Sequence, residues 1–127
     1  MVKGELLDGF RTRIKSDRNE LFSDVSVELG GEDAGLDPHQ LLEASLAACT
    51  LMTLKMYAKR KDMYVGELKV DVKIEKEGKD TEFVRTIHFD PHLTDDCRNK
   101  LLEIADKCPI HKVLHSNVSI STKARNL

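Results

Sequence analysis

The stretch DPHQLLEASLAACTLMTLKMYAKRK, residues 37–61, decides most of what can be predicted for this chain. Asp37 suits a helix cap, Pro38 fits the first helical position, and Gln40 stands where a capping-box partner reaches back. The residues that follow favour one long helix that ends at about Lys61, and its middle is apolar nearly all round. We therefore expect a buried core helix that is enclosed on most sides. A monomer of 127 residues has difficulty enclosing such a helix completely, which favours a partner subunit over part of it.

The residues before this helix favour short strands. Strand-type composition extends over residues 3–29, with two β-prone runs at 10–15 and 21–27. Residues 16–19 between these runs have turn chemistry, so we expect a hairpin or meander there. The glycine-rich residues 30–35 are expected to form the loop that leads to the helix.

The second half of the chain alternates strand and helix patterns. Residues 68–75 alternate apolar and polar side chains, which predicts a strand with one buried face, and 83–89 return after a turn as its partner. Thr94 can cap a helix whose apolar stripe ends at Cys108. Residues 118–122 alternate again and predict a closing strand. This order of elements predicts an α+β fold with antiparallel sheets packed on helices.

Length and composition favour one soluble globular domain over residues 1–127, without repeats or linkers. The net charge of −2 argues against a nucleic-acid partner, because phosphate binding needs a clustered basic surface. The one basic run, residues 59–61, suits the solvated end of the long helix. Polar residues such as Glu43 and Lys55 interrupt that helix, so we expect a core helix and no membrane span.

The N-terminus lacks the apolar region of a secretory signal, so we expect a cytoplasmic protein. In such a reducing compartment, cysteines are metal ligands, catalysts or core residues more often than structural bridges. Three cysteines are present. Cys49 lies within the long apolar helix, and Cys108 lies at the end of the second helical pattern, directly before Pro109.

Each cysteine can be interpreted in more than one way. A cysteine on an apolar helix is usually a small core residue, so position alone does not make Cys49 catalytic. Cys108, placed at a helix C-terminus, would have a raised pKa and would suit a resolving thiol better than a first nucleophile. Cys97 is expected at the surface beside Asp95 and Asp96, which disfavour a thiolate there.

A metal site is an alternative interpretation. Cys108, His111 and His115 follow a C-x2-H-x3-H spacing, and Cys49 could complete a tetrahedral zinc site. This pattern is weaker than paired C-x-x-C motifs. We expect no metal and no cofactor as the main hypothesis.

Two motifs resemble the OsmC/Ohr family of osmotically inducible and organic hydroperoxide resistance proteins. Residues 38–50, PHQLLEASLAACT, are similar to the family's helix, which begins at a proline and carries a Leu-Leu pair and an Ala-Cys-Thr sequence, and residues 108–111 are similar to its second signature, C-P-[VI]-H. The glycine-containing residues 30–38 fit the family's approach to the helix. The continuation, residues 51–58, is most similar to the OsmC-like branch.

The resemblance implies an OsmC-like fold built around a long central helix, in an intertwined homodimer with active sites at the subunit interface. It also implies thiol-dependent reduction of organic hydroperoxides, with Cys49 as the peroxidatic thiol and Cys108 as the resolving thiol. The disulfide between them would be reduced by an external dithiol.

The chain departs from the family pattern at the position of His39, where strongly active relatives carry a carboxylate paired with an N-terminal arginine. Arg11, Arg13 and Arg18 are all candidates for that arginine. A cysteine peroxidase is therefore the main hypothesis. A redox sensor or small-molecule-binding protein on the same scaffold is the alternative that the missing carboxylate favours.

Overall fold

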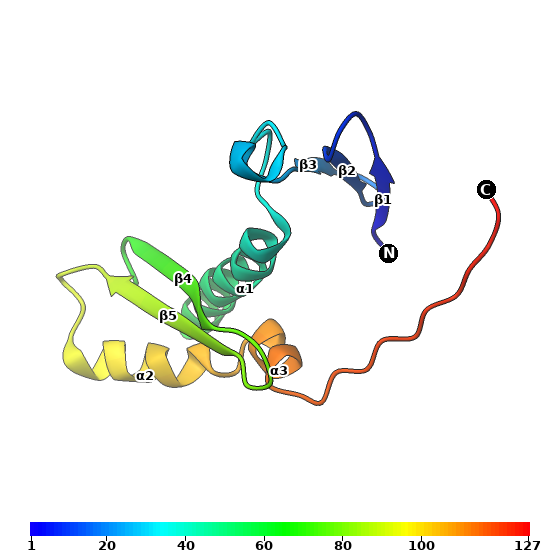
Figure 1. Cartoon of the computed structure of the whole chain (residues 1–127). Coiled ribbons are helices and arrows are strands. Elements are labelled where there is room, and N and C mark those ends of the chain that lie inside the picture. Colours follow the sequence, from blue (N-terminus) through cyan, green and yellow to red (C-terminus); the bar gives the residue numbers. More distant parts are fainter. The chain divides into compact units, whose positions relative to one another are not determined.

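The computed structural model describes residues 1–127, and the elements follow one another as short strands, a long helix, a hairpin and two helices (Figure 1). Their bounds are β1 Lys3–Leu6, β2 Thr12–Lys15, β3 Glu20–Ser23, the 3-10 helix η1 Val27–Leu29, α1 Pro38–Arg60, β4 Leu68–Lys76, β5 Glu82–Phe89, α2 Asp95–Ala105 and α3 Pro109–Leu114.

The chain forms two compact units. The first, which we call the sheet unit, contains residues 1–44 and 73–84. The second, the thiol unit, contains residues 45–72 and 85–127 and carries all three cysteines. The prediction of one domain over the whole chain stays a prediction.

The sheet unit is built on an antiparallel three-stranded sheet in the order β1-β2-β3. The turn between β2 and β3 forms where turn chemistry predicted it, closed by a hydrogen bond from the Ser16 N–H to the Asn19 carbonyl. Strand β3 ends one residue before Asp24, whose carboxylate accepts the N–H groups of Val25, Glu32 and Ala34. The predicted strand at 21–27 was therefore too long, because this carboxylate draws the backbone into a loop.

The start of α1 is the capping box that the sequence predicted. The Asp37 carboxylate accepts the Gln40 N–H at 2.8 Å, and the Gln40 side chain accepts the Asp37 N–H at 2.9 Å. These reciprocal bonds satisfy backbone donors that have no partner within the helix. The long helix therefore starts where it was predicted, and it ends at Arg60, one residue before the expected Lys61.

The hydrophobic core lies in the thiol unit. The Thr94 hydroxyl caps α2 by accepting the Cys97 N–H, as predicted. Helix α2 then packs its apolar stripe on the C-terminal half of α1. The buried cluster contains Leu54, Tyr57, Ala58, Val65, Leu93, Leu101, Ile104 and Ala105.

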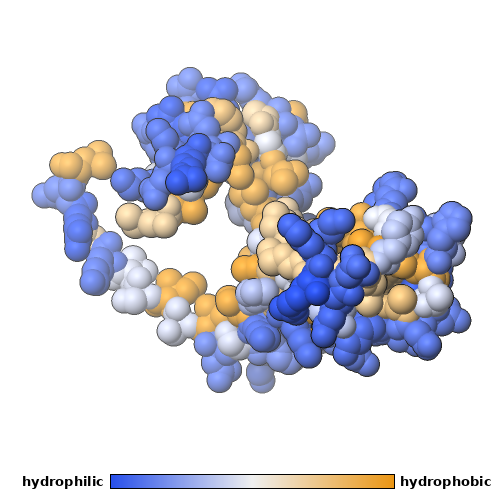
Figure 2. All heavy atoms as spheres, turned by 180° about the vertical axis from the view of Figure 1, so that it is seen from behind, coloured by the Kyte–Doolittle hydropathy of each residue, from blue (hydrophilic) through white to orange (hydrophobic).

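Burial of α1 is less complete than we expected. Its buried residues are Leu46, Thr50, Leu54, Tyr57 and Ala58, whereas Met52 and Met56 are exposed. Figure 2 shows such hydrophobic residues, in orange, at the surface of the chain. Helix α1 is long and apolar enough to cross a membrane by length and composition, a test that core helices of soluble proteins also pass.

The predicted closing strand at residues 118–122 is wrong for this structure. The residues beyond His115 form no strand and are exposed, including Val118 and Ile120. Alternating side chains favour a strand, but a strand also needs a neighbour whose backbone accepts its hydrogen bonds. In this structure residues 118–122 pair with none of the strands.

Candidate active site

Cys49 lies in the middle of α1, half-buried, within the thiol unit. The next residue, Thr50, is fully buried, and its hydroxyl donates to the Leu46 carbonyl at 2.7 Å. One turn later, the Thr53 hydroxyl lies 4.0 Å from the Cys49 sulfur. The helix thus holds the thiol at a boundary between packed and accessible surface.

Cys108 lies in a different setting from the one we predicted. Helix α2 ends at Ala105, and Cys108 is the N-cap of the next helix, α3. Its side chain is completely buried, and its sulfur accepts the His111 N–H at 3.4 Å. Pro109 at the first position of α3 explains the error, because proline suits the start of a helix as well as the end of the one before it.

The fold brings the Cys49 and Cys108 side chains into hydrogen-bond contact. Burial opposes the thiolate at Cys49, but hydrogen bonds from Cys108, the Ile110 N–H and the Thr53 hydroxyl outweigh it, with help from the positive charge of Arg85. The pKa of Cys49 is therefore lowered. Burial raises the pKa of Cys108, and so does its hydrogen bond to Cys49. The contact fits a Cys49 thiolate that accepts a hydrogen bond from a neutral Cys108 thiol.

Sequence reasoning missed Arg85, which lies on the inner face of β5. Its guanidinium donates to the Thr50 hydroxyl at 3.1 Å, to the Ala105 carbonyl at 3.2 Å and to the Asp106 carboxylate at 2.9 Å. A signal was present in the sequence, because Arg85 alternates in phase with the apolar Ile87 and Phe89. A cation on the buried face of a strand needs partners.

The metal alternative finds no support. The structure contains no group of three or more His, Cys, Asp or Glu side chains that could hold a metal ion. The rings of His111 and His115 stack on each other with centroids 5.8 Å apart. Of the predicted ligand set, Cys49 and Cys108 contact each other.

Cys97 is half-buried, and it packs against the core cluster of the thiol unit. We expected it at the surface. Its place in the first turn of α2 is as predicted.

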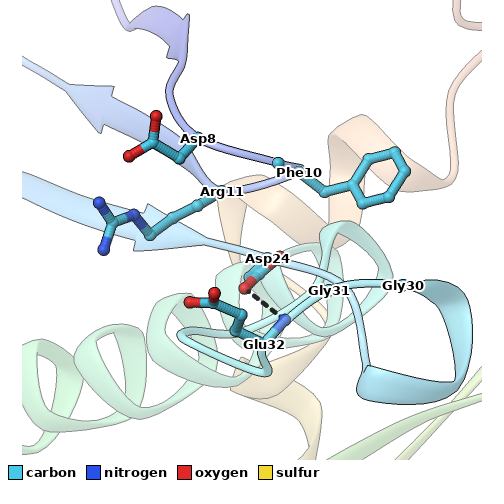
Figure 3. Close-up of a pocket in the computed structure, with 8 residues that line it drawn as sticks. Asp8, Phe10, Arg11, Asp24, Gly30, Gly31 and Glu32 are labelled. Atoms are coloured by element: carbon cyan, nitrogen blue, oxygen red, sulfur yellow. Dashed lines mark hydrogen bonds between the residues drawn. The ribbon is translucent and has the colours of Figure 1, made fainter.

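A small pocket of about 90 Å³ lies in the sheet unit (Figure 3). It is lined by Asp8, Gly9, Phe10, Arg11, Asp24, Gly30, Gly31 and Glu32. Gly31 is required here, because a side chain at this position would collide with the Val25 carbonyl and the Asp24 carboxylate. Burial works against the charge of Asp24, but three backbone N–H groups and Arg11 lower its pKa overall. The pocket contains no cysteine, and we assign it no chemistry.

A model of the OsmC-like protein family matches residues 30–123, a range that includes both cysteines of the pair. The chain belongs to the OsmC-like protein family. No curated protein matches the sequence.

Solved structures of OsmC-like proteins share the fold. A putative osmotic stress induced and detoxification response protein from Psychrobacter arcticus is 22% identical, with a TM-score of 0.76 over 88% of this chain and 85% of that one. An OsmC-like protein from Mycoplasma pneumoniae is 18% identical, with a TM-score of 0.72 over 91% and 86%. An organic hydroperoxide resistance protein from Elizabethkingia anophelis is 24% identical, with a TM-score of 0.66 over 92% and 89%.

His39, which stands where the resemblance implies a carboxylate, and Glu43 both lie in the sheet unit. His39 Nε2 contacts the Glu77 carboxylate at 2.8 Å, a hydrogen bond that raises the pKa of His39. Glu43, the nearest carboxylate in α1, accepts the Ile74 N–H at 2.8 Å. Both carboxylates therefore have partners within the sheet unit.

The three candidate arginines all lie in the sheet unit. Arg11 stacks over the ring of Phe22 at 5.8 Å, Arg13 pairs with Glu5, and Arg18 is exposed.

Proposed function

We propose that this protein is a thiol-dependent peroxidase that reduces organic hydroperoxides through Cys49 and Cys108. The observation that carries the proposal is the hydrogen-bonded thiol pair, in which the pKa of Cys49 is lowered and that of Cys108 is raised. A peroxidatic cysteine must be a thiolate when peroxide arrives, and a resolving cysteine needs to react only afterwards. The lowered pKa belongs to Cys49, which would react first, and the raised pKa belongs to Cys108, which would react second.

The chemistry proceeds in two steps. The Cys49 thiolate attacks the distal peroxide oxygen, so that an S–O bond forms, the O–O bond breaks, and the alkoxide leaves and is protonated to the alcohol. Cys108 then attacks the Cys49 sulfenic acid, so that the S–S bond forms and water leaves. The two thiols supply the two electrons. An external dithiol reduces the disulfide and restores both thiols.

The surroundings of Cys49 support an organic substrate. Met52 and Met56 follow Cys49 at helical spacing, so they share its face of α1, and both are exposed. An apolar surface beside the thiol favours alkyl hydroperoxides over hydrogen peroxide. Among the fold neighbours, the protein from Elizabethkingia anophelis is named as an organic hydroperoxide resistance protein.

We further propose that the protein works as a homodimer. Exposed apolar side chains on α1 and the sheet, together with the unpaired residues 118–122, leave surface that a second copy would cover. A second copy would also offer residues 118–122, which are unpaired here, a strand with which to pair. Free thiols fit a cytoplasmic location, where the dithiol reductant would be available.

The test is turnover of t-butyl hydroperoxide with a dithiol as reductant. Wild type should consume peroxide catalytically, and Cys49→Ser should lose this activity. Cys108→Ser should allow one reaction and then over-oxidation of Cys49, visible as a sulfinic acid by mass spectrometry. Turnover that survives in Cys49→Ser would overturn the proposal.

The second candidate is a redox sensor on the same scaffold. His39, paired with Glu77, stands where the resemblance led us to expect a carboxylate, and this favours slow turnover. A sensor would form the disulfide once and would fail to cycle in the same assay. The assay therefore separates the two candidates with a single preparation.

A further inference from the structure

The guanidinium group of Arg85, at the inner face of β5, has three hydrogen-bond acceptors. The side chain of Arg85 is only 12% exposed. Burying a cation costs free energy unless hydrogen bonds replace its water. One terminal nitrogen of Arg85 donates to Thr50 and to the Ala105 carbonyl, and the other donates to Asp106. The side chain is thus fixed in place by three acceptors.

These acceptors adjoin the two cysteines. Thr50 follows Cys49 in α1, so the bond to its hydroxyl holds the helix turn that carries the first thiol. Ala105 and Asp106 belong to the short link between α2 and Cys108. A single side chain from a third element therefore ties together the two segments that carry the thiol pair.

We propose that Arg85 is the positioning residue of the Cys49–Cys108 pair and the resident positive charge that favours the Cys49 thiolate. The catalytic meaning of this role rests on the proposed peroxidase function, whereas its effect on the thiols does not require peroxide. The guanidinium holds the two sulfur atoms within reach of each other and offsets the negative charge that develops on Cys49.

The charges around the pair agree with this role. Burial opposes a thiolate at Cys49, hydrogen bonds from Cys108, Ile110 and Thr53 favour it, and Arg85 adds the positive charge. Among the neighbours of Arg85, Asp106 is 69% exposed, and His111 Nδ1 lies 3.9 Å from its carboxylate. Asp106 anchors Arg85 and offsets part of its charge. Neutralising Asp106 would therefore loosen the position of Arg85 while its positive charge remains, which separates the two roles.

The first experiment measures the pH profile of iodoacetamide alkylation at Cys49 in the reduced full-length protein, with peptide mapping to distinguish the three cysteines. Arg85→Met should move the profile to higher pH and slow alkylation at pH 7 roughly threefold, because an opposite charge near the thiolate is lost. Arg85→Lys, which keeps the charge, should recover much of the rate. Lys59→Met is the control: it removes an exposed positive charge from α1, the helix that carries Cys49, and should leave the profile unchanged.

The second experiment uses Asp106→Asn, which alters an exposed residue and should not disturb the core. Its alkylation profile should not move to higher pH, because the charge of Arg85 remains. Closure of the Cys49–Cys108 disulfide by diamide should slow roughly threefold, as expected for the loss of one surface ion pair.

An Arg85→Met profile that matches wild type in a folded protein would overturn the proposed charge role. Unchanged diamide closure in Asp106→Asn would overturn the positioning role. Neither readout uses a hydroperoxide. Absence of peroxide turnover would therefore count against the proposed function alone.

Discussion

The two units of the chain are stabilised in opposite ways. In the thiol unit, a cluster of apolar side chains from α1, α2 and the connecting segments is buried. In the sheet unit, the buried side chains are the polar Ser23 and Asp24, whereas Phe10, Leu21 and Phe22 remain exposed. One unit thus has its own hydrophobic core. The other is organised by backbone pairing and by a buried carboxylate, and its apolar surface is left uncovered.

This difference indicates where a partner is needed. An apolar side chain that stays in water contributes nothing to stability through burial, so the sheet unit gains from any surface that covers it. The thiol unit already encloses Cys108 and holds Cys49 beside it. We therefore expect the chemistry of the thiol pair to depend on the core, and association to depend on the exposed surface.

The largest expected effect is in the core of the thiol unit. Leu101 is completely buried, and its sequence neighbour Leu102 in α2 is 47% exposed. Leu101→Ala should lower the free energy of unfolding by about 3 kcal/mol, because it leaves a cavity, whereas Leu102→Ala should cost less than about 1 kcal/mol. Urea unfolding followed by circular dichroism measures both. Equal losses in the two variants would contradict the core described here.

The next effect concerns the sheet unit. Leu6 is exposed on β1, and a second copy that covers it would bury an apolar side chain. Leu6→Ser should weaken self-association roughly thirtyfold, since burial of a leucine contributes about 2 kcal/mol and each 1.4 kcal/mol is a factor of about ten. Sedimentation velocity over a dilution series gives the dissociation constant, and Lys15→Ser is the exposed polar control. A wild-type protein that stays monomeric throughout would contradict the proposed homodimer.

A smaller effect is expected on the pH dependence of stability, through one aspartate in each unit: Asp90 in the thiol unit and Asp24 in the sheet unit. In the thiol unit, the His92 N–H, the His92 ring and the Glu67 N–H lower the pKa of Asp90 from 3.8 to about 2. Because the folded pKa is the lower one, Asp90 stabilises the protein above about pH 4, and this contribution is lost as the pH falls towards 2. Asp90→Asn should therefore lower the melting temperature at pH 7 and flatten its fall between pH 4 and 2.

Asp24→Asn should act in the same direction in the sheet unit, because the pKa of Asp24 is also lowered. Melting curves by circular dichroism from pH 2 to 7 test both variants. An Asp90→Asn variant that loses stability on acidification as steeply as wild type would show that this carboxylate has no such role.

The smallest expected effect is at Cys97. This thiol packs against the core of the thiol unit but takes no part in the proposed chemistry. Cys97→Ser should leave dithiol-dependent turnover within about twofold of wild type and cost under about 1 kcal/mol of stability. Coupled turnover and a urea titration check the two halves of the prediction. A large loss of turnover would require a third cysteine in the mechanism.

Local signals in the sequence predicted much of the fold. The Asp37–Gln40 capping box, the strand alternation at 68–75 and the Thr94 cap each act over a few residues, and each appears where it was predicted. The strand at 118–122 failed because strand formation depends on a neighbour that the local pattern does not specify.

The site was harder to predict than the fold. Spacing alone gave no distance between Cys49 and Cys108, and the family resemblance supplied their pairing. The role of Arg85 was not predicted, because it depends on hydrogen bonds to three residues that are distant in the sequence. Arg85 lies in phase with the buried face of β5, which is the signal that the sequence carries for it. A charged residue at an apolar position of a strand should prompt a search for such partners.

The most direct test of the central claim is the product formed when the fully reduced protein meets one equivalent of t-butyl hydroperoxide, without added reductant. Intact mass and non-reducing peptide mapping identify it. The account predicts a protein lighter by about 2 Da, with a disulfide that joins Cys49 to Cys108. A protein that stays fully reduced, or one oxidised at Cys97 while Cys49 remains a thiol, would contradict the assignment of the thiol pair.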